Sequence, residues 1–260
     1  RRNEIRQSWR AESESIQNGS ALVVFVLGRR DDESTTSNIS RESEQFGDIL
    51  FLDVIDSYVG LVFKMMAAFR WAVEGCDPVP EFVLKVDTDV VVHVDRLIDN
   101  LPQEESAPLS LWCDYTWPSA SPNRDTCSRW FVSETVYSAD YFPIYCNGPA
   151  YFGRRKAFES IVATAKKTKV FPVEDAFFTG VVAEAAGVER ECALRFMSHQ
   201  WTNKSYCHKH DTPSLSILST HFGKIRNPGI LKTWQALKAI QCDSTGEFLY
   251  RLFAERVSCK

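Results

Sequence analysis

The sequence lacks any apolar stretch that approaches the roughly 20 residues of a membrane-spanning helix. It also lacks an excess of positive charge, because 30 basic residues stand against 34 acidic ones, for a net charge of -4. This balance argues against a nucleic-acid-binding surface and against membrane docking through a polybasic patch. The chain has no internal repeat, no low-complexity linker and no C-x-x-C pair, which disfavours a zinc ribbon or a thioredoxin-like motif.

What is present is the composition of an ordinary folded protein, with 44% hydrophobic and 25% charged residues. A chain of 260 residues can bury a sizeable core, and we expect one domain that spans residues 1–260. The sequence begins on Arg1-Arg2 without a signal peptide. We therefore expect a soluble domain whose targeting segment lies outside this sequence.

The cysteines and glycosylation sequons together point to an oxidising compartment. Eight cysteines, an even number, permit complete pairing, although their spacing does not determine which pairs form. Sequons at Asn18, Asn38 and Asn203 agree with a secretory route. We expect disulfides to hold the loops of residues 109–146 and the segment 192–242.

The first half of the sequence alternates strand and helix patterns, which predicts a parallel sheet. Strands are expected at 21–27, 49–52 and 82–86, and helices at 41–46, 61–73 and 95–101, with a polar loop at 29–38. Residues 109–145 carry tryptophans and tyrosines among prolines and serines, a pattern typical of short strands and long loops. Further helices are expected at 155–166, 174–186 and 228–240, and a late strand at 216–219.

The most informative motif is Asp87-Thr88-Asp89, between an apolar run at 82–86 and three valines at 90–92. Such a run predicts a strand buried on both faces. Ligands of open α/β sheets gather at the carboxyl ends of strands. Two carboxylates at this point suit Mg²⁺ or Mn²⁺ and the phosphates that these cations carry. An isolated Asp-x-Asp is more often a solvated turn, but solvated turns seldom lie between two apolar strands.

Short motifs between residue 2 and about residue 242 strengthen this interpretation. They include RNEIRQSW at 2–9, GDIL at 47–50 with Asp53, DSY at 56–58 with Lys64, KVDTD at 85–89, SRWFVS at 128–133, YFPIYCNG at 141–148, EDAFFTG at 174–180 and the segment from His221 to Leu237. In the same order they resemble the motifs of the β-1,3-glycosyltransferases of glycosyltransferase family 31. That family contains galactosyl- and N-acetylglucosaminyltransferases.

The resemblance implies a GT-A type α/β fold, with a Rossmann-like, mainly parallel sheet flanked by helices and a loop-rich acceptor region. Residues 1–101 would form the nucleotide-sugar-binding half, and residues 102–260 the half that holds the acceptor and the catalytic base. The implied reaction is inverting, metal-dependent transfer of galactose from UDP-galactose to a glycan, glycolipid or glycoprotein acceptor, forming a β-1,3 linkage. UDP-N-acetylglucosamine as donor and a non-catalytic sugar-binding protein are the alternatives. The implied location is the Golgi lumen, with a type II membrane anchor outside this sequence.

The same resemblance assigns residues to the donor site. Asp89 is expected to ligate the metal, Asp87 to face the ribose or the metal's water shell, and His221 to be a further ligand. Imidazole favours Mn²⁺ over Mg²⁺. The other expected donor-binding residues are Arg2, Arg6, Asp53, Asp56, Lys64 and Lys85. Solvated charge is the alternative for each basic residue, and a surface or core histidine is the alternative for His221.

Inversion at the sugar carbon requires a base on the side opposite UDP. The resemblance selects Asp175, which follows Glu174 at a predicted helix start. Acids at helix starts commonly serve as caps, so one of the two can cap while the other reaches the acceptor. The aromatic residues at 109–145 either stack on acceptor sugars or pack in the core. A two-metal phosphohydrolase is disfavoured, since the second half lacks the His/Asp clusters of such a centre.

Overall fold

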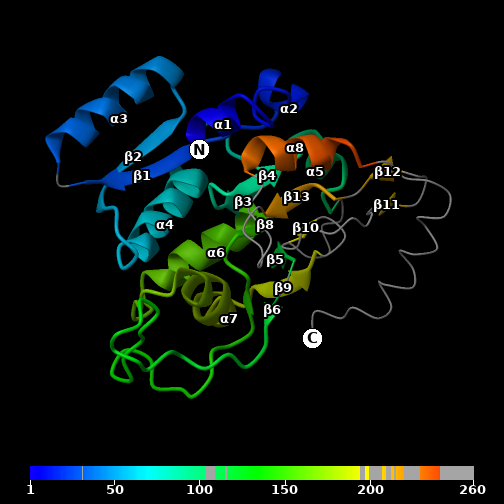
Figure 1. The fold of residues 1–260 in the computed structure, drawn as a ribbon. Coiled ribbons are helices and arrows are strands. Elements are labelled where there is room, and N and C mark those ends of the chain that lie inside the picture. Colours follow the sequence, from blue (N-terminus) through cyan, green and yellow to red (C-terminus); the bar gives the residue numbers. More distant parts are fainter. Residues whose placement is uncertain are drawn as a thin grey trace.

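The structure of the chain is a computed structural model with helices and strands in mixed order (Figure 1). It describes residues 1–30, 32–102, 109–114, 116–193, 197–198, 207–208, 212–213, 215–219 and 229–240. The chain opens with two short helices, α1 (Arg2–Arg6) and α2 (Glu14–Gln17). Among the described helices, none is both long enough and apolar enough to cross a membrane.

The first strand–helix–strand unit is parallel, as the alternating pattern predicts. Strands β1 (Phe25–Arg29) and β2 (Ile49–Ile55) are parallel neighbours joined by α3 (Glu33–Phe46). The Asp32 side chain caps α3 by accepting a hydrogen bond from the Thr35 amide at 2.6 Å. The helix ends at Gly47, whose φ of 62° is a left-handed conformation that glycine adopts readily. The prediction of a polar loop over residues 29–38 is therefore wrong, because the helix already begins at Glu33.

The central sheet is mixed, with strand order β3-β8-β5-β9. Its strands are β3 (Phe82–Val86), β8 (Ala150–Arg154), β5 (Ser110–Cys113) and β9 (Glu189–Cys192). Strand β8 runs antiparallel to both β3 and β5, whereas β5 and β9 are parallel. The expectation of a mainly parallel, Rossmann-like sheet is thus wrong for the described residues. Strand β3 pairs with a strand from the second half of the chain, and the local alternation of strands and helices carried no signal of that pairing.

Several helices and short strands surround this sheet. The helices are α4 (Leu61–Arg70) with its π-helical extension η1 (Trp71–Gly75), α5 (Val94–Asp99), α6 (Arg155–Ala165), the π-helical η2 (Ala176–Val182) that continues into α7 (Ala183–Ala185), and α8 (Ile230–Lys238). The short strands are β4 (Val90–Val92), β6 (Thr116–Trp117), β7 (Tyr145–Cys146), β10 (Met197–Ser198), β11 (Cys207–His208), β12 (Thr212–Pro213) and β13 (Ile217–Ser219). The helices predicted at 61–73, 95–101, 155–166, 174–186 and 228–240 are confirmed to within a few residues.

The central sheet separates two hydrophobic cores, because alternate residues of its strands face opposite sides. Tyr151 and Leu111 belong to the core that contains residues of α4, α6 and η2, whereas Phe152 and Trp112 belong to the core that contains residues of α5 and α8. Figure 1 shows α6 and α7 on one side of the strands and α5 and α8 on the other. The prediction for the 82–86 strand is confirmed in that alternate residues of β3 pack against the two cores, although these residues are only partly buried. Trp9, which lies in the N-terminal motif, packs in the second core.

A disulfide fixes the loop-rich middle of the chain, as expected. It joins Cys113 at the end of β5 to Cys146 in β7, with Cα atoms 5.7 Å apart. Cys192 is disulfide-bonded as well, while Cys76 and Cys127 are free thiols. The structure therefore supports an oxidised protein in which not every cysteine is paired.

Candidate active site

The Asp87-Thr88-Asp89 motif forms a tight turn between β3 and β4, at the carboxyl end of β3. The Asp87 amide donates to the Pro149 carbonyl at 2.9 Å, and the Val90 amide donates to the Asp87 carbonyl at 3.1 Å. The Asp87 side chain is 49% exposed and the Asp89 side chain 14% exposed. The Arg1 guanidinium lies 4.0 Å from the Asp89 carboxylate. The turn thus holds two carboxylates in fixed positions, one of them open to solvent.

Lys85 lies two residues before Asp87 and points its ammonium into the protein. Its side chain is 7% exposed. The Nζ atom donates to Asp87 Oδ1 at 2.7 Å and to the Gly148 carbonyl at 2.5 Å, and it lies 3.8 Å from Glu174 Oε2. Burial alone would lower the pKa of Lys85, but the charges of Glu174 and Asp87 outweigh burial and raise this pKa. Lys85 is therefore a charged residue with its hydrogen bonds directed inward.

Glu174 and Asp175 lie in the first turn of the helical segment that continues as η2. Glu174 is buried and accepts a hydrogen bond from the Tyr151 hydroxyl at 2.6 Å. Burial raises the pKa of Glu174, and the ammonium of Lys85 opposes that rise. Lys85 and Tyr151 are direct cross-strand neighbours in the β3–β8 pair, which is why both reach Glu174.

Asp175 is partly exposed and uses its two carboxylate oxygens differently. Oδ1 accepts a hydrogen bond from the Ala176 amide at 2.9 Å. Oδ2 lies beside Gly148, where a Cβ atom would stand 2.9 Å away from it. Burial raises the pKa of Asp175, and the bond from the Ala176 amide opposes that rise. The absence of a side chain at Gly148 therefore makes room for the Asp175 carboxylate.

Aromatic side chains border Asp175. Burial, and then the negative charge of Asp175, raise the pKa values of both Tyr58 and Tyr145. The Arg129 guanidinium lies 5.2 Å from the centre of the Tyr58 ring and 4.5 Å from that of Trp130. Trp130 is 48% exposed, whereas Trp112 packs in the core. Core packing is thus confirmed for Trp112, whereas stacking of Trp130 on an acceptor sugar stays a prediction.

Arg2 and Arg6 lie in an ion cluster of their own. Arg6 donates two hydrogen bonds to the buried Asp48, at 2.8 and 2.7 Å, and a third to Glu42 at 2.7 Å. Arg2 forms a two-point ion pair with the same Glu42. These contacts attach α1 to α3 and to the start of β2. Both guanidinium groups are therefore engaged by acidic side chains of the protein.

The remaining predicted donor residues lie at the carboxyl end of β2 and beyond it. Asp53 is 86% exposed and 3.5 Å from Arg29. Lys64 on α4 pairs with Asp56 at 2.6 Å. His221 lies outside the described residues. Sequence reasoning gave no role to Gly148 or Tyr151, because only the β3–β8 pairing brings them beside the two acidic motifs.

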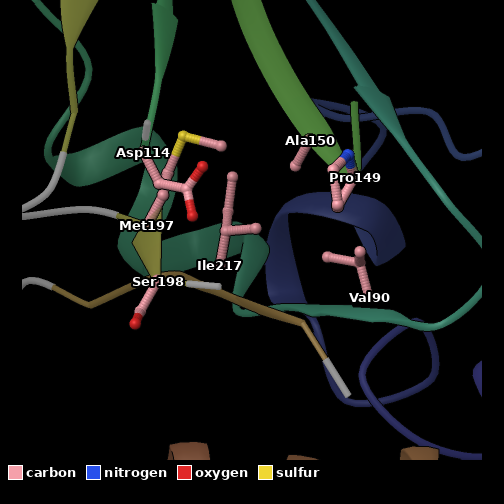
Figure 2. Close-up of a pocket in the computed structure, with 7 residues that line it drawn as sticks. All are labelled: Val90, Asp114, Pro149, Ala150, Met197, Ser198 and Ile217. Atoms are coloured by element: carbon pink, nitrogen blue, oxygen red, sulfur yellow. The ribbon is translucent and has the colours of Figure 1, made fainter. Parts of the chain in front are cut away.

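A small pocket lies behind the Asp87–Asp89 turn. Figure 2 shows Val90, Pro149 and Ala150 on one side of it, and Asp114 and Met197 on the other. Ser198 and Ile217 complete its lining. Asp114 is buried, and the remaining lining is mostly apolar. The pocket therefore lies where residues of β4, β8, β10 and β13 meet.

The described residues contain no cluster of three or more His, Cys, Asp or Glu side chains arranged to hold a metal ion. The donor set at the turn nevertheless fits a hard divalent cation in part, since Asp87 and Asp89 supply carboxylate oxygens from positions two residues apart in one turn. Mg²⁺ and Mn²⁺ commonly take one or two carboxylates and complete their coordination with phosphate oxygens and water. The turn is therefore suited to a cation that arrives together with a phosphorylated ligand.

Comparisons with known proteins give this arrangement a context. A family model described as Galactosyltransferase matches residues 1–193. Beta-1,3-galactosyltransferase bre-2 of Caenorhabditis elegans is 27% identical over 253 residues, which cover 94% of this chain and 68% of that protein. Human beta-1,3-galactosyltransferase 1 is 28% identical over 176 residues, covering 68% of this chain and 53% of that protein. Beta-1,3-galactosyltransferase 5 of Pan paniscus is 27% identical over 90% of this chain and 75% of that protein. The aligned part of the chain spans about half the length of the human relative.

Proposed function

Because this chain belongs to the galactosyltransferase family, we propose that it transfers galactose from UDP-galactose to a hydroxyl of an acceptor glycan, with inversion, forming a β-1,3 linkage. One observation carries the proposal. Lys85 and Gly148 bring the Asp87–Asp89 turn and the Glu174–Asp175 pair together, so that carboxylates from two distant motifs border one site. The Asp87–Asp89 turn suits the diphosphate side of a sugar nucleotide, and the Glu174–Asp175 pair suits the acceptor side.

On the donor side, Asp87 and Asp89 would hold Mn²⁺, or Mg²⁺ in its place. The bound cation would offset the negative charge that develops on the diphosphate as it leaves. Asp56 and Lys64 border the end of β2 and are proposed to contact the nucleotide. Arg2 and Arg6 would act on the donor only indirectly, by anchoring α1 through Glu42 and Asp48. His221 is kept as a proposed further metal ligand.

On the acceptor side, Asp175 is proposed to be the general base. The acceptor hydroxyl oxygen would form a bond to C1 of galactose while the bond from C1 to the UDP oxygen breaks. The hydroxyl proton would pass to Asp175, and UDP would depart with the bonding electrons. Burial raises the pKa of Asp175, which makes its carboxylate a stronger proton acceptor than an exposed one. Because Gly148 has no side chain, it does not cover the Oδ2 atom of Asp175.

The wider context follows from the same proposal. We propose a GT-A type arrangement in a single domain, because β3 pairs with β8 and β4 with β13, so the two halves of the chain share their sheets. The Cys113–Cys146 disulfide agrees with an oxidising compartment, and we propose that the protein acts in the Golgi lumen. It would be held there as a type II membrane protein. The acceptor would be a glycan, glycolipid or glycoprotein. Galactose is preferred over N-acetylglucosamine as donor sugar because the relatives named above are all beta-1,3-galactosyltransferases.

The test is a donor screen on the purified protein. UDP-galactose, UDP-N-acetylglucosamine, UDP-glucose and UDP-N-acetylgalactosamine are each incubated with short acceptors that end in different sugars. Each reaction is run with Mn²⁺, with Mg²⁺ and with a chelator, and the linkage of any product is determined by NMR. We expect transfer from UDP-galactose only, a β-1,3 product and no activity in the chelator.

The matched inactive variant is Asp175→Asn, which keeps the shape of the side chain and the oxygen that accepts from the Ala176 amide. We expect it to bind UDP as the wild type does and to lose at least ~10²-fold in turnover. Transfer of another sugar would contradict the proposed donor. Normal turnover in Asp175→Asn would contradict the assignment of the base.

A further inference from the structure

The buried contacts of Lys85 conflict with a direct role in binding the donor. Two hydrogen bonds and one ion pair direct its ammonium toward Asp87, the Gly148 carbonyl and Glu174, and its side chain is 7% exposed. A lysine that binds a diphosphate presents its ammonium to the ligand as a point charge. Here the ammonium is instead shared between two segments of the protein that the proposed reaction uses separately.

We propose that Lys85 is a positioning residue that joins the donor side of the reaction centre to the acceptor side. It fixes Asp87 directly, and through Glu174 and Gly148 it fixes the segments that set the position of Asp175. This inference rests on the proposed function and adds to it a buried link between the two acidic motifs. We name Lys85, Glu174 and Tyr151 together as the buried link.

The geometry on the acceptor side explains how the link reaches Asp175. The Tyr151 hydroxyl and the Lys85 ammonium approach different oxygens of Glu174, at 2.6 and 3.8 Å, so the carboxylate is held from two directions. Glu174 is bonded through the chain to Asp175, and a change in its position moves the start of the helical segment. Lys85 also holds the Gly148 carbonyl, and Gly148 lies against Asp175 Oδ2. The position of Asp175 is therefore set from two directions: through the backbone by the adjacent Glu174, and through space by Gly148.

The contacts of the buried link depend on one another, because the loss of one member leaves the others buried without their partner. Glu174 and Tyr151 are buried, and Tyr151 is fully enclosed. A buried carboxylate that loses its counter-charge is left uncompensated, which is far more costly than removal of both charges together. Lys85 also lies 5.6 Å from the centre of the Tyr151 ring. Since each member touches the next, substitutions within the buried link should be non-additive.

The experiment measures kcat, acceptor KM, UDP affinity and melting temperature in a set of variants. Tyr151→Phe removes one hydroxyl that contacts Glu174 and leaves the fully buried ring in place. We expect its kcat to fall about 2- to 10-fold, the equivalent of one hydrogen bond, with UDP affinity unchanged. Lys85→Met is expected to lower kcat on the order of 10²-fold, the loss that follows when a reacting group is misplaced by about 1 Å.

A second comparison guards against variants that fold poorly. Lys85→Met/Glu174→Gln removes both buried charges, and Tyr151→Phe is then added to it. The buried link predicts that Tyr151→Phe costs little further kcat in that background, because its contact no longer controls Asp175. Lys166→Met is the matched control, since Lys166 is 53% exposed and pairs with the exposed Glu74 instead of an acid of either motif. We expect its kcat to be unchanged.

The results separate this inference from the proposed function. A wild-type protein that transfers no sugar overturns both. An active wild type whose Tyr151→Phe and Lys85→Met variants keep normal kcat, with only lower melting temperatures, overturns the buried link alone. A fall in UDP affinity for Lys85→Met that is as large as the fall in kcat and that persists in a chelator, where Asp87 holds no cation, would make Lys85 a donor ligand and would also overturn the link.

Discussion

The ion cluster of Arg2, Arg6, Glu42 and Asp48 makes a sharp prediction about acid stability. Glu42 accepts hydrogen bonds from Arg2 at 2.8 Å and from Arg6 at 2.7 Å. The hydrogen bond from Arg2 contributes most to lowering the pKa of Glu42, burial opposes it, and the pKa is about 2 in the folded protein. The perturbation is Glu42→Gln, which removes the charge and keeps the size of the side chain.

The magnitude follows from proton linkage. An unfolded glutamate has a pKa of about 4.3, so a folded pKa of about 2 corresponds to about 3 kcal/mol at neutral pH. This figure is an upper limit, because the Glu42 side chain is 22% exposed and solvent screens the ion pairs. We expect Glu42→Gln to lower the free energy of unfolding by about 1–2 kcal/mol at pH 6.

The direction of the pH dependence is fixed by the lowered pKa. A carboxylate whose folded pKa is depressed stabilises the protein fully above its unfolded pKa and loses that effect as pH falls toward the folded value. The difference in stability between wild type and Glu42→Gln should therefore shrink by about half between pH 6 and pH 3. At still lower pH, through the folded pKa of about 2, it should vanish.

The assay is urea unfolding at half-unit steps from pH 3 to pH 7. Glu44→Gln, an exposed acid on the same helix, serves as the control and should change stability by less than about 0.5 kcal/mol. A Glu42→Gln effect that is equally small, or one that stays constant over this pH range, would refute the reasoning. In either case Arg2 would be available for another partner, whereas Arg6 would still be held by Asp48.

Two further predictions concern the metal and the disulfide. Asp89→Ala should abolish transfer and weaken UDP binding in Mn²⁺ by at least ~10²-fold, measured by calorimetry. The control is an exposed acid, and Asp140→Ala should bind UDP normally. Equal UDP affinity in the two variants would exclude Asp89 as a ligand. Replacing both Cys113 and Cys146 by serine removes a disulfide between residues 33 positions apart. This should lower the free energy of unfolding in urea by about 3–4 kcal/mol. Cys127→Ser, at a free and exposed thiol, should cost less than about 0.5 kcal/mol, and similar losses in the two experiments would mean that the disulfide does not stabilise the fold.

The sequence predicted best the features that depend on neighbouring residues. The strand over residues 82–86 is correct to the residue, because an uninterrupted apolar run leaves few alternatives. For helix α3 the sequence predicts only residues 41–46, because the first turns of this helix are rich in Ser and Thr, which favour loops, and because the cap at Asp32 lies in a polar stretch. Its packing beside β2 outweighs the weak local preference.

Features that depend on distant pairings were not predictable. Nothing near Arg2 indicates Glu42, which lies 40 residues away, and nothing near Lys85 indicates Gly148, which lies 63 residues away. The resemblance places both basic residues at the donor. In the structure Arg2 pairs with Glu42 and Lys85 pairs with Glu174, and only the folded chain brings these partners close. The two acidic motifs were recognised separately by resemblance, but their connection through β8 required the structure.

The Glu174–Asp175 pair shows why the candidate base needs both kinds of reasoning. The sequence predicts that one acid caps the helical segment while the other reaches the acceptor. In the structure, Asp175 Oδ1 makes the bond to the backbone amide, and Oδ2 faces Gly148, while Glu174 is buried against Tyr151 and Lys85. One carboxylate can therefore serve both purposes, because its two oxygens point to different partners. Asparagine at position 175 keeps the oxygen needed for the first purpose and lacks the basicity needed for the second, so stability and turnover should separate cleanly in that variant.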